Sequence, residues 1–248
     1  MRKSIARDVK EAAAERALLS ALSDDLSLPL LQIKTTLDVL EQANMAAKKS
    51  RPHLERLRFS ADTGLQLIEA YRLALRIMPV ANLALEPVAI GSILQDVAHQ
   101  LAPYARHYST TVEVDIKGNI IPALAHKPSL TVALECLGAS IIRAQATQGQ
   151  PQKNYRLLLG AHRAAGQVVA AGVFSGVQGL SDRALRNARD LAGRARQPLT
   201  EAPAGTAAGV LIADMLCSAM WQPLRAAAHR NLHGLAINIP ASKQLQFV

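Results

Sequence analysis

The spacing of leucine in the first 80 residues is the feature that most restricts what this chain can fold into. Apolar side chains recur every three or four residues in two separate series, which is the period of one buried stripe along a helix. The first series comprises Leu19, Leu22, Leu26, Leu30, Ile33, Leu37 and Leu40. The second series comprises Leu54, Leu57, Ala61, Leu65, Ile68 and Leu75. The pattern predicts two long helices that pack in a bundle.

A turn joins the two predicted helices. Residues 46–52 read AAKKSRP, in which Ser50 can cap the second helix and Pro52 suits its first turn. Pro79 ends the second helix, and Pro29 weakens or kinks the first because proline removes a backbone donor. One antiparallel hairpin cannot bury seams of this width, whereas two chains together form a four-helix bundle. We therefore expect residues 1–80 to be a dimerisation domain in a homodimer, with packing on the chain's own downstream domain as the alternative.

Beyond Pro79 the pattern changes to a mixture of helix and strand signals. Helices are predicted over residues 92–104, 127–145 and 205–220. Strands are predicted over residues 110–116, 155–159, 167–174 and 234–239, each bounded by turn residues or by an adjoining helix. Helices on one face of a mixed sheet form an α+β sandwich. The expected fold class is thus α+β, with a helical hairpin followed by an α/β sandwich over residues 85–248.

The composition argues against several classes of protein. Half of the residues are apolar but only 3% are aromatic, so alanine and leucine, which are the best helix formers, build the core. No apolar run approaches the ~20 residues that span a bilayer, and the first residues, MRKS, lack an apolar signal segment. We expect a soluble, cytoplasmic protein in which Cys136 and Cys217 are buried and reduced. The net charge of +9 attracts anions, but there is no long basic block or aromatic RNA-binding strand, so nucleic acid is not the favoured partner.

A short segment inside the first predicted helix carries the most informative motif. Residues 22–30 read LSDDLSLPL, which resembles the phosphoacceptor box of sensor histidine kinases, usually FSHELRTPL. In that register Asp24 takes the place of the phosphorylated histidine, Asp25 follows it, and Pro29 stands five residues further on, as in the family. A carboxylate cannot replace an imidazole as acceptor. The resemblance therefore implies a histidine-kinase core that has lost its acceptor, and the order of elements after Pro79 resembles the ATP-binding domain shared by histidine kinases, gyrases and heat-shock ATPases.

The helix predicted over residues 127–145 contains the counterpart of the kinases' asparagine box. Residues 135–143 read ECLGASIIR where the family reads NLLxNAxKY. The resemblance implies that Glu135 could meet a magnesium ion through oxygen and that Arg143 could meet a phosphate, whereas Ala139 can do neither. A helix that is mostly packing surface is the alternative.

Two glycine segments complete the resemblance. Residues 205–212, GTAAGVLI, are similar to the family's GTGLGLAI, with Gly205, Thr206 and Gly209 in place and Ala207 replacing the middle glycine. Such a segment opens a helix with free N–H groups that favour phosphate, although small residues there also permit tight packing. Residues 174–180, FSGVQGL, stand where the family reads DxGxG.

In that second segment Ser175 takes the place of the aspartate, and Gly176 and Gly179 lie in the loop; a turn without a ligand is the alternative. The arginine-rich residues 181–204 correspond to the family's flexible lid. If the site is retained, these residues together would bind ATP with magnesium.

Three functions are compatible with this sequence. The leading hypothesis is a pseudokinase of two-component signalling, a dimeric scaffold that presents the bundle face around Asp24 to a receiver domain or to a genuine histidine kinase. The second is an active ATP-dependent kinase or ATPase, which would require Glu135, Arg143, Gly205 and Gly209 to suffice. The third is a relay adaptor similar to kinase-derived dimeric histidine phosphotransferases, although those proteins keep the histidine.

Overall fold

The computed structural model describes residues 83–148, 154–176 and 207–242, together with the isolated positions 30, 31, 33–35, 37, 38, 54, 57, 61, 64, 65, 68, 72 and 185. The chain divides into two compact units, Met1–Pro79 and Val80–Val248, and each is described by itself. Among the described residues, no helix is both long enough and apolar enough to cross a bilayer.

The described positions of the first unit are all helical. Leu37, Ala61 and Ile68 are buried, as their places in the two leucine series predict. Ile33 and Leu57 belong to the same series but are 45% and 51% exposed. A Cβ built on Gly64 would lie 2.6 Å from Cδ1 of Leu30, so these two positions are close together. The hairpin as a whole, including its turn, lies outside the described residues and stays a prediction.

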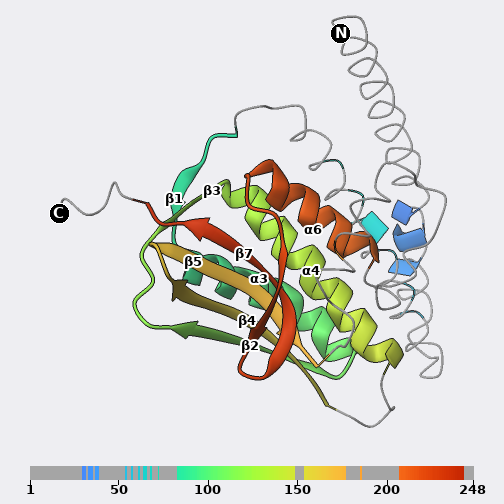
Figure 1. Cartoon of the computed structure of the whole chain (residues 1–248). Coiled ribbons are helices and arrows are strands. Elements are labelled where there is room, and N and C mark those ends of the chain that lie inside the picture. The colour runs from blue at the N-terminus through green and yellow to red at the C-terminus, as the bar shows by residue number, and fades with distance from the viewer. Residues whose placement is uncertain are drawn as a thin grey trace, which may run out of the picture. The chain divides into compact units, whose positions relative to one another are not determined.

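The second unit is an α+β sandwich built on a mixed sheet (Figure 1). Its elements are β1 (Glu86–Val88), α3 (Ile90–His107), β2 (Thr110–Lys117), β3 (Ala123–Ala125), α4 (Lys127–Gln148), β4 (Tyr155–Ala164), β5 (Val168–Ser175), α6 (Ala207–Ala219), β6 (Arg225–His229) and β7 (Leu232–Pro240). The main sheet has the strand order β2-β4-β5-β7-β6, and β1 pairs with β3 in a small separate ladder. β2 and β4 run parallel, and the other neighbours in the main sheet are antiparallel.

The three helices cover one face of this sheet (Figure 1). Branched side chains on β4, β5 and β7 form that face of the core, and each is at most 1% exposed: Leu157, Leu159, Val169, Val173, Leu235 and Ile237. α3 contributes an apolar stripe that includes Leu101. Gly138 lets α4 approach closely, since a Cβ at that position would lie 2.5 Å from Cδ1 of Leu101.

On the opposite face of the sheet, the end of the chain's own β6–β7 hairpin curls over part of the surface (Figure 1). Arg230 and Asn231 form the two-residue turn, with φ of 45° and 61°, the left-handed pair that suits a tight hairpin. Gly172 and Gly234 permit the close approach of β5 and β7. A Cβ on Gly234 would lie 2.0 Å from the carbonyl oxygen of Val173, and one on Gly172 would lie 2.4 Å from that of Leu235. A small apolar cluster of Leu158, Phe174 and Ala236 is buried beneath.

In the second unit the predicted helices and strands agree with the structure in type, with four corrections. The strand predicted over 155–159 runs on to Ala164. The helix predicted over 92–104 begins earlier and runs to His107, passing through Pro103. Residues 225–229, RAAAH, form β6, which the sequence did not predict because alanine favours helix. β1 and β3 were also missed, since a strand of three residues is too short to show alternation.

Candidate nucleotide site

Helix α6 begins directly against α4, and Gly209 is the point of contact. A Cβ on Gly209 would lie 1.9 Å from Oγ of Ser140 and 2.6 Å from the carbonyl oxygen of Cys136. Gly209 is buried, as are both of these α4 residues. The glycine that the family resemblance assigned to a phosphate-facing helix start therefore has a packing role: it lets two helix backbones meet.

The two α4 positions assigned to the magnesium side of the site are both buried. Glu135 is 9% exposed and Ala139 is 5% exposed. Burial, together with the charge of Glu135, raises the pKa of the neighbouring Cys136 thiol to about 12, despite the opposing effect of Arg143. Cys136 is therefore a protonated thiol at neutral pH. Among the described residues, no group of three or more His, Cys, Asp or Glu side chains could hold a metal ion.

Arg143 points to α3. Its Nη1 donates to the hydroxyl of Tyr104 at 3.1 Å, and its Nη2 donates to Oγ of Ser140 at 3.0 Å. The ring of Tyr104 lies 5.0 Å from that of Tyr108. Burial and the nearby Tyr104 raise the pKa of Tyr108 to about 12, with Arg143 acting in the opposite direction. The guanidinium predicted to meet a phosphate is thus engaged in joining α3 to α4.

The end of β5 gives the position that corresponds to the adenine-binding aspartate. Ser175 is completely buried in the sheet, paired in register with Leu157 on β4 and His233 on β7. Gly176, the next residue, is exposed, and a Cβ there would meet nothing within 4 Å. Ser175 therefore offers no exposed oxygen to a ligand.

The other predicted site residues lie outside the described part of the chain. These are Asp24, Asp25, Pro29, Gly179, Gly205 and Thr206. Of the segment that corresponds to the lid, the structure describes Leu185 alone, which is helical and 3% exposed. The structure thus brings Glu135, Arg143 and Gly209 to one region around α4, and leaves Ser175 inside the sheet.

These described residues do not fit a magnesium nucleotide. Magnesium needs several oxygen ligands in near-octahedral geometry, and α4 offers one buried carboxylate with alanine at the second position. Arg143, the cation assigned to a phosphate, is engaged with Tyr104 and Ser140.

A second polar cluster, which the sequence did not reveal, lies on the other face of the sheet. Nε2 of His229 lies 2.7 Å from Oδ2 of Asp115, and Nη2 of Arg230 donates to Oδ1 of the same carboxylate at 2.6 Å. His229 is 5% exposed, and its ring stacks against those of Phe174 and His162 with centroids 5.2 Å and 5.7 Å away. Asp115 and His229 are more than a hundred residues apart in sequence, so only the folded sheet brings them together.

Several solved structures resemble this chain, whereas no family model and no curated protein sequence matches it. Full-length ShkA, solved in complex with AMPPNP, is 21% identical with a TM-score of 0.57, over 91% of this chain and 46% of that one. The histidine kinase AdeS from Acinetobacter baumannii is 12% identical with a TM-score of 0.49, over 86% of this chain and 95% of AdeS. The catalytic domain of the histidine kinase ThkA is 11% identical with a TM-score of 0.45, over 64% and 96% of the two chains.

The fold is therefore that of a histidine-kinase-like core, as the sequence motifs predicted. The mixed sheet with helices on one face confirms the α+β class of the second unit. The chain spans about half the length of ShkA, at 46%. At this level of identity the likeness concerns architecture, and the residues of the site have to be judged by their own geometry.

Proposed function

We propose that this chain is a two-component signalling protein built on a histidine-kinase-like core, and that it acts as a dimeric scaffold without transferring phosphate itself. The observation that carries the proposal is the engagement of Arg143, whose guanidinium donates to Tyr104 and Ser140, beside the buried Glu135 and Ala139 on the same helix. The sequence agrees, because Asp24 stands in place of the acceptor histidine and Ala139 in place of an asparagine. Phosphoryl transfer depends on metal and positioning, and both are deficient in the described residues.

Calorimetric titration of the full chain with ATP and magnesium tests this proposal directly. We expect no binding in the micromolar range and no release of labelled phosphate. Micromolar binding with turnover would favour the alternative of an enzyme with a nonstandard site. In that case Glu135→Ala should abolish the signal, whereas Glu113→Ala, which removes an exposed glutamate paired with Arg156 on the sheet, should not.

The exposed members of the leucine series support the dimer. Ile33 and Leu57 are 45% and 51% exposed in a single copy, although they belong to the seam that includes the buried Leu37. A second copy in a four-helix bundle would cover them. Light scattering coupled to size exclusion should give a dimer, and Ile33→Asp should give a monomer. Leu85→Asp, which changes an equally apolar side chain that is 38% exposed in the other unit, should leave the dimer intact; a monomeric wild type overturns this part of the proposal.

The partner we propose is a receiver domain or a genuine histidine kinase that docks around Asp24 and Asp25. Binding measured with a purified receiver should weaken at least tenfold in the Asp24→Asn, Asp25→Asn double variant. Asp38→Asn is the matched control, because it removes one carboxylate from a partly exposed helical position of the same unit. Mass spectrometry after mixing with a phosphorylated receiver separates this scaffold from a relay adaptor, which would itself acquire phosphate.

A further inference from the structure

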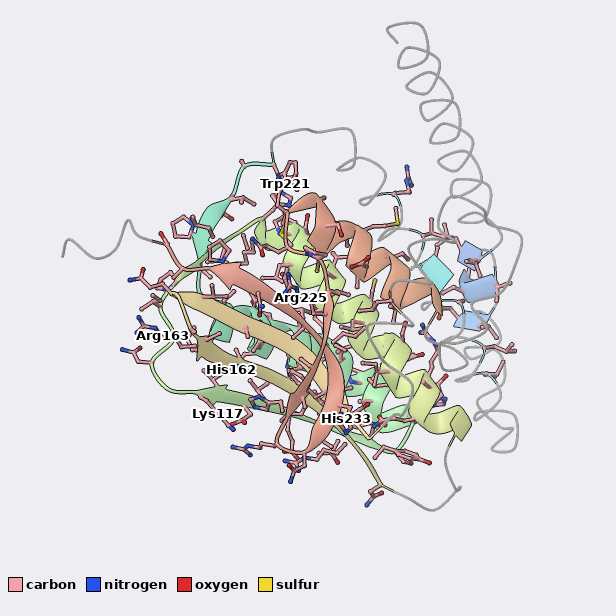
Figure 2. All side chains as sticks on the ribbon, viewed as in Figure 1. Lys117, His162, Arg163, Trp221, Arg225 and His233 are labelled. Atoms are coloured by element: carbon pink, nitrogen blue, oxygen red, sulfur yellow. The ribbon has the colours of Figure 1, made fainter. Side chains whose placement is uncertain are left out.

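The face of the sheet not covered by helices carries a group of cationic side chains at the ends of two parallel strands. Lys117 on β2 and His162 on β4 are directly paired in register, so they project from the same side of the sheet as neighbours. Figure 2 places them together, with Arg163 beyond them at the same end of β4. Arg163 follows His162 in the strand and therefore projects to the opposite side.

The turn of the β6–β7 hairpin adds a third and a fourth member from above this face. The ring of His229 lies 5.7 Å from that of His162, and it also sits over Gly160, where a Cβ would be 3.2 Å from its Cδ2. Arg230 is held by its bond to Asp115, and its side chain remains 49% exposed. A glycine at position 160 is thus what allows the hairpin to bring its cations down to the strand ends.

Asp115 is the acidic residue of this cluster, and both of its carboxylate oxygens are already hydrogen-bonded. Asp115 is 9% exposed, and each of its two oxygens has a partner, His229 on one side and Arg230 on the other. Within the described ranges, no carboxylate forms an ion pair with Lys117 or with His162. Lys117 and Arg230 contribute +2 and Asp115 contributes −1, so the cluster has a net charge of +1 before its histidines are counted.

His162 responds to this excess of positive charge. Burial lowers the pKa of His162 below its ordinary value, and the nearby His229 and Lys117 lower it further. Like charges placed opposite each other on neighbouring strands are destabilising, so protonation of His162 is disfavoured as long as nothing negative lies between them. An anion at this place would remove the repulsion and would draw a proton onto His162, which brings the cluster to +2.

We infer that Lys117, His162 and Arg230 form a binding site for the dianion of a phosphate monoester on the helix-free face of the sheet. Lysine and arginine make strong charge-assisted hydrogen bonds to phosphate oxygens, and a protonated imidazole adds a third donor. Lys117 and His162 are register partners on neighbouring strand ends, and Arg230 comes from the turn next to His229, whose ring stacks on that of His162. This arrangement suits a single phosphoryl group, whose charge of about −2 matches the cluster once His162 is protonated.

The ring protons of His162 report on this site. At low ionic strength the full chain is titrated with inorganic phosphate, and the pH titration of His162, identified by comparison with His162→Gln, is followed by NMR. We expect phosphate to raise the pKa of His162 and Lys117→Ala to weaken phosphate binding at least tenfold. Arg163→Ala removes an exposed cation of the same strand from the other side, so it should leave both measurements unchanged. If phosphate binds without moving His162, or moves it equally in Lys117→Ala, the site does not exist.

A second arm identifies where the phosphoryl group comes from. A phosphoserine peptide and its unphosphorylated counterpart are titrated in the same way. Binding of the phosphopeptide ten times tighter than inorganic phosphate assigns the site to a modified protein, and equal affinity assigns it to a free anion. Equal binding of both peptides overturns the inference, because the phosphoryl group would then contribute nothing.

Discussion

The contact between α4 and α6 can be tested by adding one methyl group. In Gly209→Ala the new Cβ would lie 1.9 Å from Oγ of Ser140 and 2.6 Å from the carbonyl oxygen of Cys136. The hydroxyl of Ser140 can rotate away from the new methyl group. The carbonyl of Cys136 belongs to the backbone of α4, so it cannot move unless the helix moves. Overpacking a well-packed core costs about 1–3 kcal/mol, and we expect the upper end, about 3 kcal/mol, because one obstacle is backbone.

The cost should be measured by urea denaturation of the full chain, followed by circular dichroism. Gly176→Ala is the matched control, because a Cβ at that position meets nothing within 4 Å, so its free energy of unfolding should stay within about 0.5 kcal/mol of wild type. Ser140→Gly removes the nearer of the two obstacles, and in a double-mutant cycle it should recover about 1–2 kcal/mol of the loss. A Gly209→Ala protein as stable as Gly176→Ala would refute the reasoning that Gly209 is a packing glycine.

Three further predictions follow from other parts of the second unit. The pKa of His162 is lowered in the folded protein, so below about pH 6.5 the unfolded chain binds more protons than the folded one. The contribution of His162 to the free energy of unfolding should therefore be constant above that pH and fall as the pH is lowered. His162→Gln should flatten this part of the plot of unfolding free energy against pH. Trp221 follows the end of α6 with a left-handed φ of 62°; its N–H donates to the carbonyl of Ser218, and the N–H of Gln222 donates to that of Cys217. Helices favour glycine at such a position, so Trp221→Gly should be about 1 kcal/mol more stable than Trp221→Ala in chemical denaturation. Equal stabilities of the two variants would contradict this. Burial raises the pKa of the Cys217 thiol above its usual range, and burial with Glu135 raises that of Cys136, so neither should react with Ellman's reagent until the protein is unfolded.

The elements that the sequence predicted are those whose signal is local. The alternation of Val112, Val114 and Ile116 identified β2, and the resemblance of residues 205–212 to a glycine box that opens a helix agrees with α6. β6 was missed because its alanines favour helix, and it is a strand only because β7 pairs with it through the whole of its length. Strand pairing depends on tertiary structure, so the sequence of one short segment does not reveal it.

The candidate site was predictable in position but not in chemistry. The motifs placed Glu135, Arg143 and Gly209 on the correct helices, because the order of elements was right. Their roles could not be read from type and spacing. Arginine suits both phosphate and tyrosine hydroxyl, and its engagement with Tyr104 depends on how α3 crosses α4. The same holds for Asp115, whose partners come from a turn more than a hundred residues away.

The two faces of the sheet of the second unit use their polar side chains differently. On the helix side, residues that the family resemblance assigned to a nucleotide make packing contacts within the chain: Gly209 against α4 and Arg143 against Tyr104. These contacts stabilise the sandwich, because they join α4 to α6 and to α3. On the other side, Asp115 uses its charge to hold the β6–β7 turn, which leaves cations at the strand ends unneutralised. The sandwich is thus held together by its own side chains on both faces of the sheet, and the cations at the strand ends are available to the anion that we propose.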